Sequence, residues 1–217
     1  MSAAPPEIIQ QLETFANVSR ETLERLEAYL DLLAKWQKKI NLVSNASLDQ
    51  AWTRHVVDSA QLWPLASENA LIWTDLGSGA GFPGIVLGIL GCERPGFAMH
   101  LVESDQRKAA FLREAIRVTG AAAEVHCARI EEIEPISSDV VTARALAPLK
   151  KLLVLSNPFV KSEGIALFLK GRSVDDELTQ AAEWGTFNAE VIPSHTDRPS
   201  HTDQGGSILK LSHLIPA

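Results

Sequence analysis

The stretch TDLGSGAGFPG, residues 74–84, contains the residue types and spacing most able to do chemistry. Four glycines and one proline fall within eleven residues, directly after the apolar run LIW. A strand that passes through such glycines into a helix presents backbone N–H groups at a helix N-terminus, where a ligand can approach closely. The loop therefore indicates a binding site, and the arrangement of its glycines indicates the class of ligand.

Two sets of glycines fit known patterns. Gly79, Gly81 and Gly84 match GxGxxG, the pattern of dinucleotide-binding loops, which is weak as a lone match. Gly77, Gly79 and Gly81 match GxGxG, with Asp75 two residues before the first glycine. We favour GxGxG, because the chain then turns directly off the strand, as ligand-binding loops of this kind normally do. An acidic side chain under the turn suits a cationic or hydroxyl-bearing ligand better than a pyrophosphate.

Glu103 is a second candidate group for the same ligand. It ends the apolar run in LVESD and lies 26 residues beyond Gly77 (103 − 77). A carboxylate can accept hydrogen bonds from both hydroxyls of a vicinal diol such as ribose. The alternative is that the loop is only a tight strand–helix turn and Glu103 a solvated strand end. Asp75, Glu103 and the order of the strands together favour a ligand site.

An acidic residue followed by GxGxG resembles the first motif of the class I S-adenosylmethionine-dependent methyltransferases. The resemblance implies that S-adenosylmethionine is the cofactor, that Asp75, Gly77, Gly79 and Gly81 form its loop, and that Glu103 binds its ribose hydroxyls. Methylation of a pyrimidine carbon uses a nucleophilic cysteine, usually after a proline, and neither Cys92 nor Cys127 follows one. Methylation of the adenine amine uses an Asn-Pro-Pro-aromatic loop after the fourth strand, and this chain has VVTARALAPL there. Both reactions are therefore disfavoured.

The elements that would position this loop change in character along the chain. Residues 7–65 have helical periodicity, with Ser19 as a plausible N-cap. After it, Leu23, Leu26, Leu30, Leu33, Trp36 and Ile40 form one helix face. Ser47 and Gln50 form a capping box that predicts a helix continuing to about residue 63. We expect a helical N-terminal extension over residues 1–66.

Short apolar runs and amphipathic segments alternate after residue 71. Buried strands are predicted at LIWTDL, FAMHLVE, AEVHCA, DVVTA and GIALFLK, with helices near 84–91, 105–118, 148–157 and 173–184. Two strands without an intervening helix, FNAEVIPSH and GSILKLSHL, close the chain. This pattern predicts an α/β, Rossmann-like fold: a seven-stranded, mostly parallel sheet with helices on both faces and an antiparallel addition at one edge. Residues 67–217 would form the cofactor-binding domain, packed with the extension as one compact unit.

Composition narrows the class of protein further. The 217 residues are 46% hydrophobic, and no apolar run reaches the length of a membrane span. The N-terminus shows no export signal, and the two cysteines, Cys92 and Cys127, are far apart, which fits a cytoplasmic protein. No metal-ligand spacing is evident, so we expect no metal. The net charge of −7 argues mildly against coating nucleic acid but allows a local basic face.

Arg144 stands where the fourth strand should end, at the ligand-facing edge of a parallel sheet. Arginine stays protonated and cannot act as a general base, but it can bind a phosphate, a carboxylate or a base edge. A salt bridge to a nearby carboxylate is an equally good interpretation. His55 and Asp58, three apart on one helix, suggest helix packing and an ion pair involving Arg54, with a functional role for His55 left open.

Four further stretches, SGAGFPGIVL, RHVVDSAQL, NLVS and ARALAPL, closely resemble the bacterial ribosomal RNA small-subunit methyltransferase G family (glucose-inhibited division protein B). The resemblance runs from about residue 35 to 171 and implies methyl transfer to N7 of a guanine in the 530 loop of 16S ribosomal RNA. It also implies that Gly77 and Phe82 line the cofactor pocket, and that Ile130 and Glu131 hold the adenosine end. Arg144 would position cofactor and target, without any general base. Family members commonly have Asp where this chain has Glu103.

We expect ribosomal RNA, alone or within a 30S subunit or assembly intermediate, to be bound by clustered basic side chains. Singly, the basic residues are better explained as solvated surface, but collectively they flank the expected pocket mouth. Two other functions stay open: a nicotinamide-dependent oxidoreductase using Gly79, Gly81 and Gly84, and a non-enzymatic nucleotide-sensing or RNA-binding module. The candidate RNA-binding residues are Lys35, Lys38, Lys39, Arg54, His55, Lys150, Lys151, Lys170 and Arg172.

Overall fold

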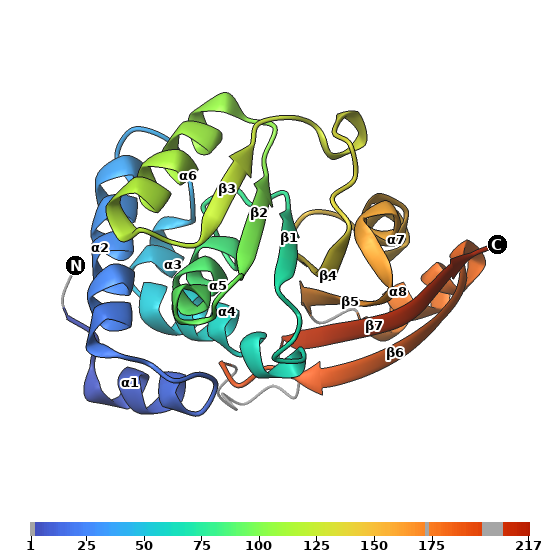
Figure 1. Ribbon diagram of the computed structural model, residues 1–217, viewed down its shortest axis with the longest axis horizontal. Coiled ribbons are helices and arrows are strands. Elements are labelled where there is room, and N and C mark those ends of the chain that lie inside the picture. The colour runs from blue at the N-terminus through green and yellow to red at the C-terminus, as the bar shows by residue number, and fades with distance from the viewer. Residues whose placement is uncertain (1–2, 172–173, 197–205) are drawn as a thin grey trace.

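The computed structural model, which describes residues 3–171, 174–196 and 206–217, contains one seven-stranded sheet (Figure 1). Its strand order is β3-β2-β1-β4-β5-β7-β6. The strands are β1 (Ile72–Leu76), β2 (Ala98–Val102), β3 (Ala123–His126), β4 (Ser138–Arg144), β5 (Val160–Lys170), β6 (Gly185–Pro193) and β7 (Ser207–Pro216). The first five are parallel, and β7 pairs antiparallel with both β5 and β6. The predicted sheet and its antiparallel edge are confirmed.

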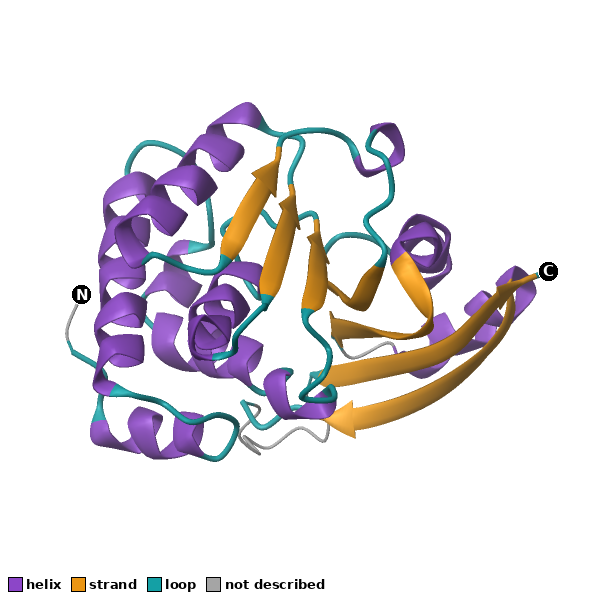
Figure 2. Ribbon diagram, in the orientation of Figure 1, coloured by secondary structure: helices purple, strands orange, loops and turns teal. Residues whose placement is uncertain are grey.

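Helices alternate with the strands, as predicted (Figure 2). The α-helices are α1 (Pro6–Glu13), α2 (Arg20–Gln37), α3 (Asn45–Leu48), α4 (Asp58–Ala60), α5 (Gly84–Leu90), α6 (Gln106–Thr119), α7 (Leu149–Ser156) and α8 (Val174–Ala181). A π-helical segment, η1 (Trp52–Val57), precedes α4, and short 3₁₀ turns are η2 (Trp63–Leu65), η3 (Gly91–Glu93), η4 (Ile130–Glu132), η5 (Asn157–Phe159) and η6 (Ala182–Trp184). No helix among the described residues is long and apolar enough to cross a membrane.

The start of α2 follows the sequence prediction, but the next helix does not. Ser19 caps α2 by accepting a hydrogen bond from the Thr22 N–H (3.1 Å). The predicted capping box at Ser47 is wrong: Ser44 is the N-cap, accepting from the Ser47 N–H (3.2 Å), and α3 ends at Leu48. The Ser47 hydroxyl donates back to the Ser44 carbonyl (2.9 Å), so it is not available to cap a helix of its own.

Two hydrophobic clusters cover the two faces of the sheet. The first joins the N-terminal helices to the sheet, so that Leu26 and Leu33 of α2 share a core with Ile85 of α5 and Phe111 of α6. The second contains apolar residues of α7, α8, β5 and β7. The N-terminal extension is thus built into the same core as the strands that carry the glycine loop, while the division at residue 66 stays a prediction.

The helices cover the sheet unequally. Figures 1 and 2 show α2, α4, α5 and α6 gathered on one side of β1, β2 and β3, at the left of the view, and α7 and α8 beside the other half of the sheet. No described helix is drawn on the opposite side of β2 and β3. The prediction that residues 123–128 form a buried strand is therefore wrong, since none of β3 is fully buried. This strand lies at the edge of the sheet, and of the described strands it pairs only with β2.

Candidate active site

The glycine loop turns off the end of β1 with three residues in left-handed conformations. Gly77, Gly79 and Gly81 have φ angles of +69°, +56° and +91°. Residues other than glycine adopt such angles only with strain. The N–H groups of Gly77 and Ser78 both donate to the carbonyl oxygen of Val102, at 2.9 and 3.0 Å. The loop is therefore fastened to the end of the neighbouring strand β2, where Glu103 follows.

Glu103 holds the loop through its carboxylate. Its Oε2 accepts a hydrogen bond from the Gly79 N–H (2.8 Å), and its Oε1 accepts from the Asp105 N–H (2.7 Å). The residue is only 7% exposed. Because each carboxylate oxygen has two lone pairs, both oxygens can still accept a second hydrogen bond from a ligand. The carboxylate is thus fixed in position before any diol arrives.

A cavity of about 330 Å³ opens beside this carboxylate, a volume within the usual range for small-molecule sites. Five of the predicted cofactor residues line it: Gly77, Gly79, Glu103, Ile130 and Glu131. It is also lined by residues that sequence reasoning missed or assigned elsewhere. These are Val102, Ser104, Lys108, Ala128, Arg129, Ala145, Leu146, Ala147, Leu155 and Lys151, the last predicted as an RNA contact.

Space next to Gly79 fits a ligand that approaches the backbone. A Cβ atom added at Gly79 would have only the Gly77 carbonyl oxygen within 4 Å, at 3.7 Å. At Gly77, by contrast, an added Cβ would lie 2.6 Å from a Leu146 methyl group. Gly79 is therefore open toward the cavity, while Gly77 is closed by the loop after β4. An open glycine beside a fixed carboxylate suits the ribose of an adenosine-containing cofactor.

Asp75 lies beneath the loop and outside the lining of this cavity. It is 1% exposed, and its Oδ1 accepts a hydrogen bond from the Thr142 hydroxyl (2.8 Å), while its Oδ2 has no hydrogen-bond partner among the described residues. Burial raises the pKa of this carboxyl to about 6, partly opposed by the hydrogen bond from Thr142. A Cβ on Gly84 would lie 2.8 Å from Asp75 Oδ2, so the start of α5 packs directly over this side chain.

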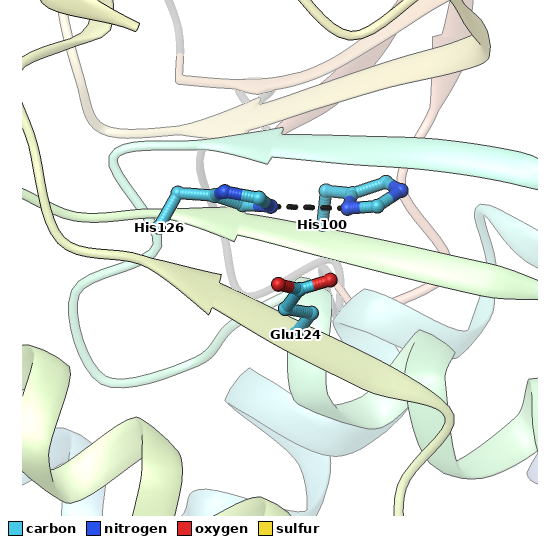
Figure 3. Close-up of side chains that lie close together, drawn as sticks. All are labelled: His100, Glu124 and His126. Atoms are coloured by element: carbon cyan, nitrogen blue, oxygen red, sulfur yellow. Dashed lines mark hydrogen bonds between the residues drawn. The ribbon is translucent and has the colours of Figure 1, made fainter.

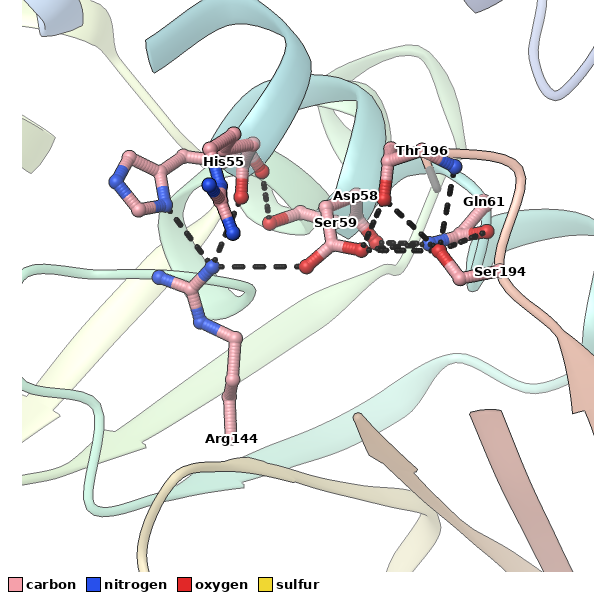
Figure 4. A network of polar contacts seen from close by, with 8 residues as sticks. His55, Asp58, Ser59, Gln61, Arg144, Ser194 and Thr196 are labelled. Atoms are coloured by element: carbon pink, nitrogen blue, oxygen red, sulfur yellow. Dashed lines mark hydrogen bonds and ion pairs between the residues drawn. The ribbon is translucent and has the colours of Figure 1, made fainter. Parts of the chain in front are cut away.

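Arg144 also lies outside the cavity lining, and its side chain belongs to a separate network of polar contacts (Figure 4). Its Nη1 donates to the Arg54 carbonyl oxygen (3.3 Å), contacts His55 Nδ1 (3.0 Å) and lies 3.6 Å from Asp58 Oδ2. The guanidinium stands over the Phe82 ring, which stacks on His55 with centroids 4.6 Å apart. Predicted cofactor residues Phe82 and Arg144 are thus in contact with the N-terminal extension.

Asp58 connects this cluster to the C-terminal part of the chain. Its Oδ1 accepts hydrogen bonds from Gln61 Nε2 (2.8 Å), the Thr196 hydroxyl (3.1 Å) and the Ser194 hydroxyl (3.3 Å). The Arg144 and Asp58 side chains are 21% and 17% exposed. Sequence reasoning assigned Asp58 an ion pair involving Arg54, whereas the structure places Arg144 of β4 against it.

The electrostatics of the cluster keep His55 neutral. Burial, reinforced by the Arg144 charge, lowers the pKa of His55 to about 3. Burial also lowers the pKa of Arg144, against the opposing effect of Asp58. His55 is 7% exposed, and its Nε2 is buried with no hydrogen-bond partner in the part of the chain that the structure describes. Its Nδ1 is therefore an acceptor that orients Arg144, and the side chain is not on the surface where an RNA contact would be made.

The remaining predicted RNA-binding residues differ in the exposure and the ion pairing of their side chains. Lys170 Nζ forms an ion pair with Glu177 Oε2 (2.6 Å) and donates a hydrogen bond to the Ala147 carbonyl oxygen (3.2 Å). Only 9% of its side chain is exposed. Lys150 forms an exposed ion pair with Glu183 (2.6 Å). Arg172 lies outside the described residues. The exposed candidates are Lys35, Lys38, Lys39, Arg54, Lys150 and Lys151.

Comparison with known proteins decides the family. The family model described as rRNA small subunit methyltransferase G matches residues 22–198. This chain belongs to that family. It is 54% identical to the ribosomal RNA small subunit methyltransferase G of Parvibaculum lavamentivorans, over 96% of this chain and 92% of the relative. It is 53% identical to the one from Rhodospirillum centenum, over 92% of this chain and 88% of the relative.

Solved structures with the same fold include more distant proteins. M. jannaschii TYW2, solved in complex with AdoMet, has a TM-score of 0.55 and 15% identity, covering 80% of this chain and 78% of its own. A mutant of MtNAS, solved in complex with S-adenosylmethionine, has a TM-score of 0.56 and 16% identity, covering 96% and 79%. These likenesses concern the fold. Family membership confirms the predicted enzyme class, an S-adenosylmethionine-dependent methyltransferase, and decides against the dinucleotide pattern of glycines.

Proposed function

We propose that this protein transfers a methyl group from S-adenosylmethionine to N7 of a guanine in the 530 loop of 16S ribosomal RNA. The observation that carries the proposal is membership of the rRNA small subunit methyltransferase G family across residues 22–198. The glycine loop, the fixed Glu103 carboxylate and the cavity beside them support the cofactor assignment. Such an enzyme would work in the cytoplasm, where ribosomal RNA is assembled with protein.

The chemistry asks little of the protein beyond positioning. Guanine N7 has an exposed lone pair and no proton, so its methylation needs no general base. The cofactor supplies a methyl group activated by its sulfonium. Holding donor and acceptor in line accounts for up to about 7–11 kcal/mol of barrier lowering in favourable cases. The contact of the His55 imidazole with Arg144 agrees with this chemistry, because that histidine is not needed as a general base.

The residues divide into three groups with different tasks. Gly77, Gly79 and Glu103 would hold the cofactor's ribose, with Ile130 and Glu131 at its adenosine end. Arg144 would position the target nucleotide and the reacting end of the cofactor, steadied by Asp58. The exposed lysines and Arg54 would meet the phosphates of RNA, through contacts that are sensitive to salt.

Mapping N7-methylguanine in 16S ribosomal RNA tests the reaction. Cells lacking this protein should lose the modification at one guanine of the 530 loop, and the wild-type chain should restore it. A chain with Gly79→Ala should fail to restore it, while Gly96→Ala, a matched change far from the loop, should succeed. Persistence of the modification in cells without the protein would contradict the proposal.

The form of the substrate needs a second experiment. Purified protein, S-adenosylmethionine and either naked 16S ribosomal RNA, an assembly intermediate or the 30S subunit should be compared for the rate of methyl transfer. We propose that the RNA is acted on within a ribonucleoprotein particle, because the overall charge of −7 gives this chain little general attraction for naked RNA. Faster methylation of naked RNA at physiological salt would contradict that choice.

A further inference from the structure

Three side chains able to bind a metal ion lie together on β2 and β3. His100 comes from β2, and Glu124 and His126 come from β3; one ligand atom of each lies within 4.8 Å of the other two. His100 Nδ1 and His126 Nε2 are hydrogen-bonded at 3.0 Å. Figure 3 shows the Glu124 carboxylate turned toward the two rings. The cluster lies apart from the residues that line the cofactor cavity.

The strand register explains why the three side chains meet. His100 is opposite Glu124, and Val102 is opposite His126, in the parallel pairing of β2 with β3. Alternate residues of a strand point to the same face, so these side chains share the face that no described helix covers. Met99 and Leu101 point the other way, into the core. The two histidines are half-buried and Glu124 is exposed, so an ion could enter from solvent.

The state of the histidines suits ligation. In the hydrogen bond between His100 Nδ1 and His126 Nε2 (3.0 Å), one ring nitrogen carries the hydrogen and the other accepts it. If that hydrogen moves to the far nitrogen of its own ring, both facing nitrogens present lone pairs. A divalent cation at the same point would satisfy both lone pairs at once.

We propose that His100, Glu124 and His126 form a binding site for a divalent transition-metal ion of the zinc class. Tetrahedral zinc with Zn–N bonds of about 2.0–2.1 Å holds its ligand nitrogens about 3.3 Å apart. The observed pair at 3.0 Å needs to open by only a few tenths of an ångström. Two imidazoles and one carboxylate suit zinc, nickel or ferrous iron, whereas calcium and magnesium prefer oxygen ligands alone.

The bound ion would connect the two strands that end at the cofactor cavity. Val102 and Ala128, which line that cavity, lie two residues beyond His100 and His126. The His126 carbonyl oxygen accepts a hydrogen bond from the Glu103 N–H (3.1 Å). Since β3 is an edge strand whose neighbour in the described sheet is β2, a metal ion joining the two would help to hold this edge in place. Binding should therefore raise the melting temperature.

The test uses the untagged, metal-free chain and Zn²⁺ as the probe. Equilibrium dialysis followed by elemental analysis should find one zinc ion per chain. Glu124→Gln and His126→Gln should each weaken zinc binding at least about tenfold, since both amides are poor ligands. Both changes are at exposed or half-buried positions and keep side-chain size or hydrogen-bonding ability, so the fold should persist. The Zn²⁺-dependent rise in melting temperature should fall in parallel.

His213→Asn is the matched control. His213 is an exposed histidine on β7, outside the cluster, and its φ of +54° is one that asparagine tolerates. This variant should bind zinc like the wild type. The proposal is overturned if the wild-type chain retains no stoichiometric zinc, if both glutamine variants bind it unchanged, or if His213→Asn loses it to the same extent.

Discussion

Two regions at the same edge of the sheet are built in opposite ways. At the end of β2, the cavity is formed by left-handed glycines and by one carboxylate fixed through backbone N–H groups. At the end of β4, the space is filled by side chains: Arg144 contacts His55 and Asp58 from the N-terminal extension and covers Phe82. The cavity at the end of β2 is open before a ligand binds, whereas the space at the end of β4 is filled by side chains that contact one another.

This difference separates preorganised binding from positioning that depends on other elements. The cavity is defined by neighbouring strand ends, so a local change there should act directly on cofactor affinity. Arg144 is engaged by residues 86 to 90 positions away, so changes there should act through the packing of the N-terminal extension (144 − 58 and 144 − 54). Changes at Gly79 and Glu103 test the cavity, and changes at His55 and Arg144 test the cluster at the end of β4.

The largest effect is expected at Gly79. Gly79→Ala places a methyl group where the ligand must approach the backbone, and S-adenosylmethionine affinity measured by calorimetry should fall at least about a hundredfold, some 2.7 kcal/mol. Gly96→Ala is the control, because Gly96 also has a positive φ (+81°) and its added Cβ would meet only Leu71, at 3.5 Å. Both variants should lose a similar 1–2 kcal/mol of stability, roughly. Equal affinity of Gly79→Ala and wild type would show that the cavity is not the cofactor site.

Glu103→Ala should have the next largest effect on cofactor affinity. It removes a charged acceptor for the ribose hydroxyls, a contact that contributes about 1.5–3 kcal/mol, or roughly ten- to a hundredfold in affinity. It also leaves the Gly79 and Asp105 N–H groups without their acceptor, so the loop should loosen. Glu132→Ala, an exposed glutamate of η4, is the control and should bind normally. Binding by Glu103→Ala within twofold of wild type would place the ribose elsewhere.

A pH titration of stability tests the occupied region. The pKa of His55 is lowered to about 3 in the folded chain and returns to about 6.5 on unfolding, so between these values the unfolded state binds more protons. Stability contributed by neutral His55 is present above pH 6.5 and is lost as pH falls. Between pH 7 and 4.5 the loss should be about 2 kcal/mol.

Denaturant unfolding of the wild type and His55→Gln at both pH values isolates this contribution. Glutamine does not titrate, so the difference in unfolding free energy between the two proteins should narrow as the pH falls. Parallel curves for the two proteins would show that His55 is solvated and takes up its proton freely in the folded state.

The smallest effect is expected for Arg144→Lys. A lysine keeps the charge but cannot contact the Arg54 carbonyl, His55 and Asp58 with one planar group, so the rate of methyl transfer should fall about tenfold. Lys161→Arg is the control: it alters the ion pair of Lys161 with Asp139 (2.6 Å), which lies near the start of β4 instead of its end. Methylation should be unchanged in that control. Full activity of Arg144→Lys would contradict a positioning role.

Local patterns determined much of this protein. Helix periodicity, the Ser19 cap and the alternation of apolar runs predicted the elements and the seven-stranded sheet. The GxGxG spacing and the place of Glu103 after a strand predicted three of the residues that line the cavity, Gly77, Gly79 and Glu103, because backbone conformation and strand ends depend on residues adjacent in the chain. Family motifs added Ile130 and Glu131, and those two residues also line the cavity.

Tertiary structure alone decided the partners of side chains. Arg144 meets Asp58, and His100 meets His126, because strand register and helix packing bring together residues that are 86 and 26 positions apart (144 − 58 and 126 − 100). The sequence predicted the same RNA-binding role for Lys151 and Lys170. In the structure, Lys151 lines the cavity, and Lys170 is largely buried and paired with Glu177. A side chain's neighbours across a sheet depend on a register that is set by the whole core, and no local pattern contains that information.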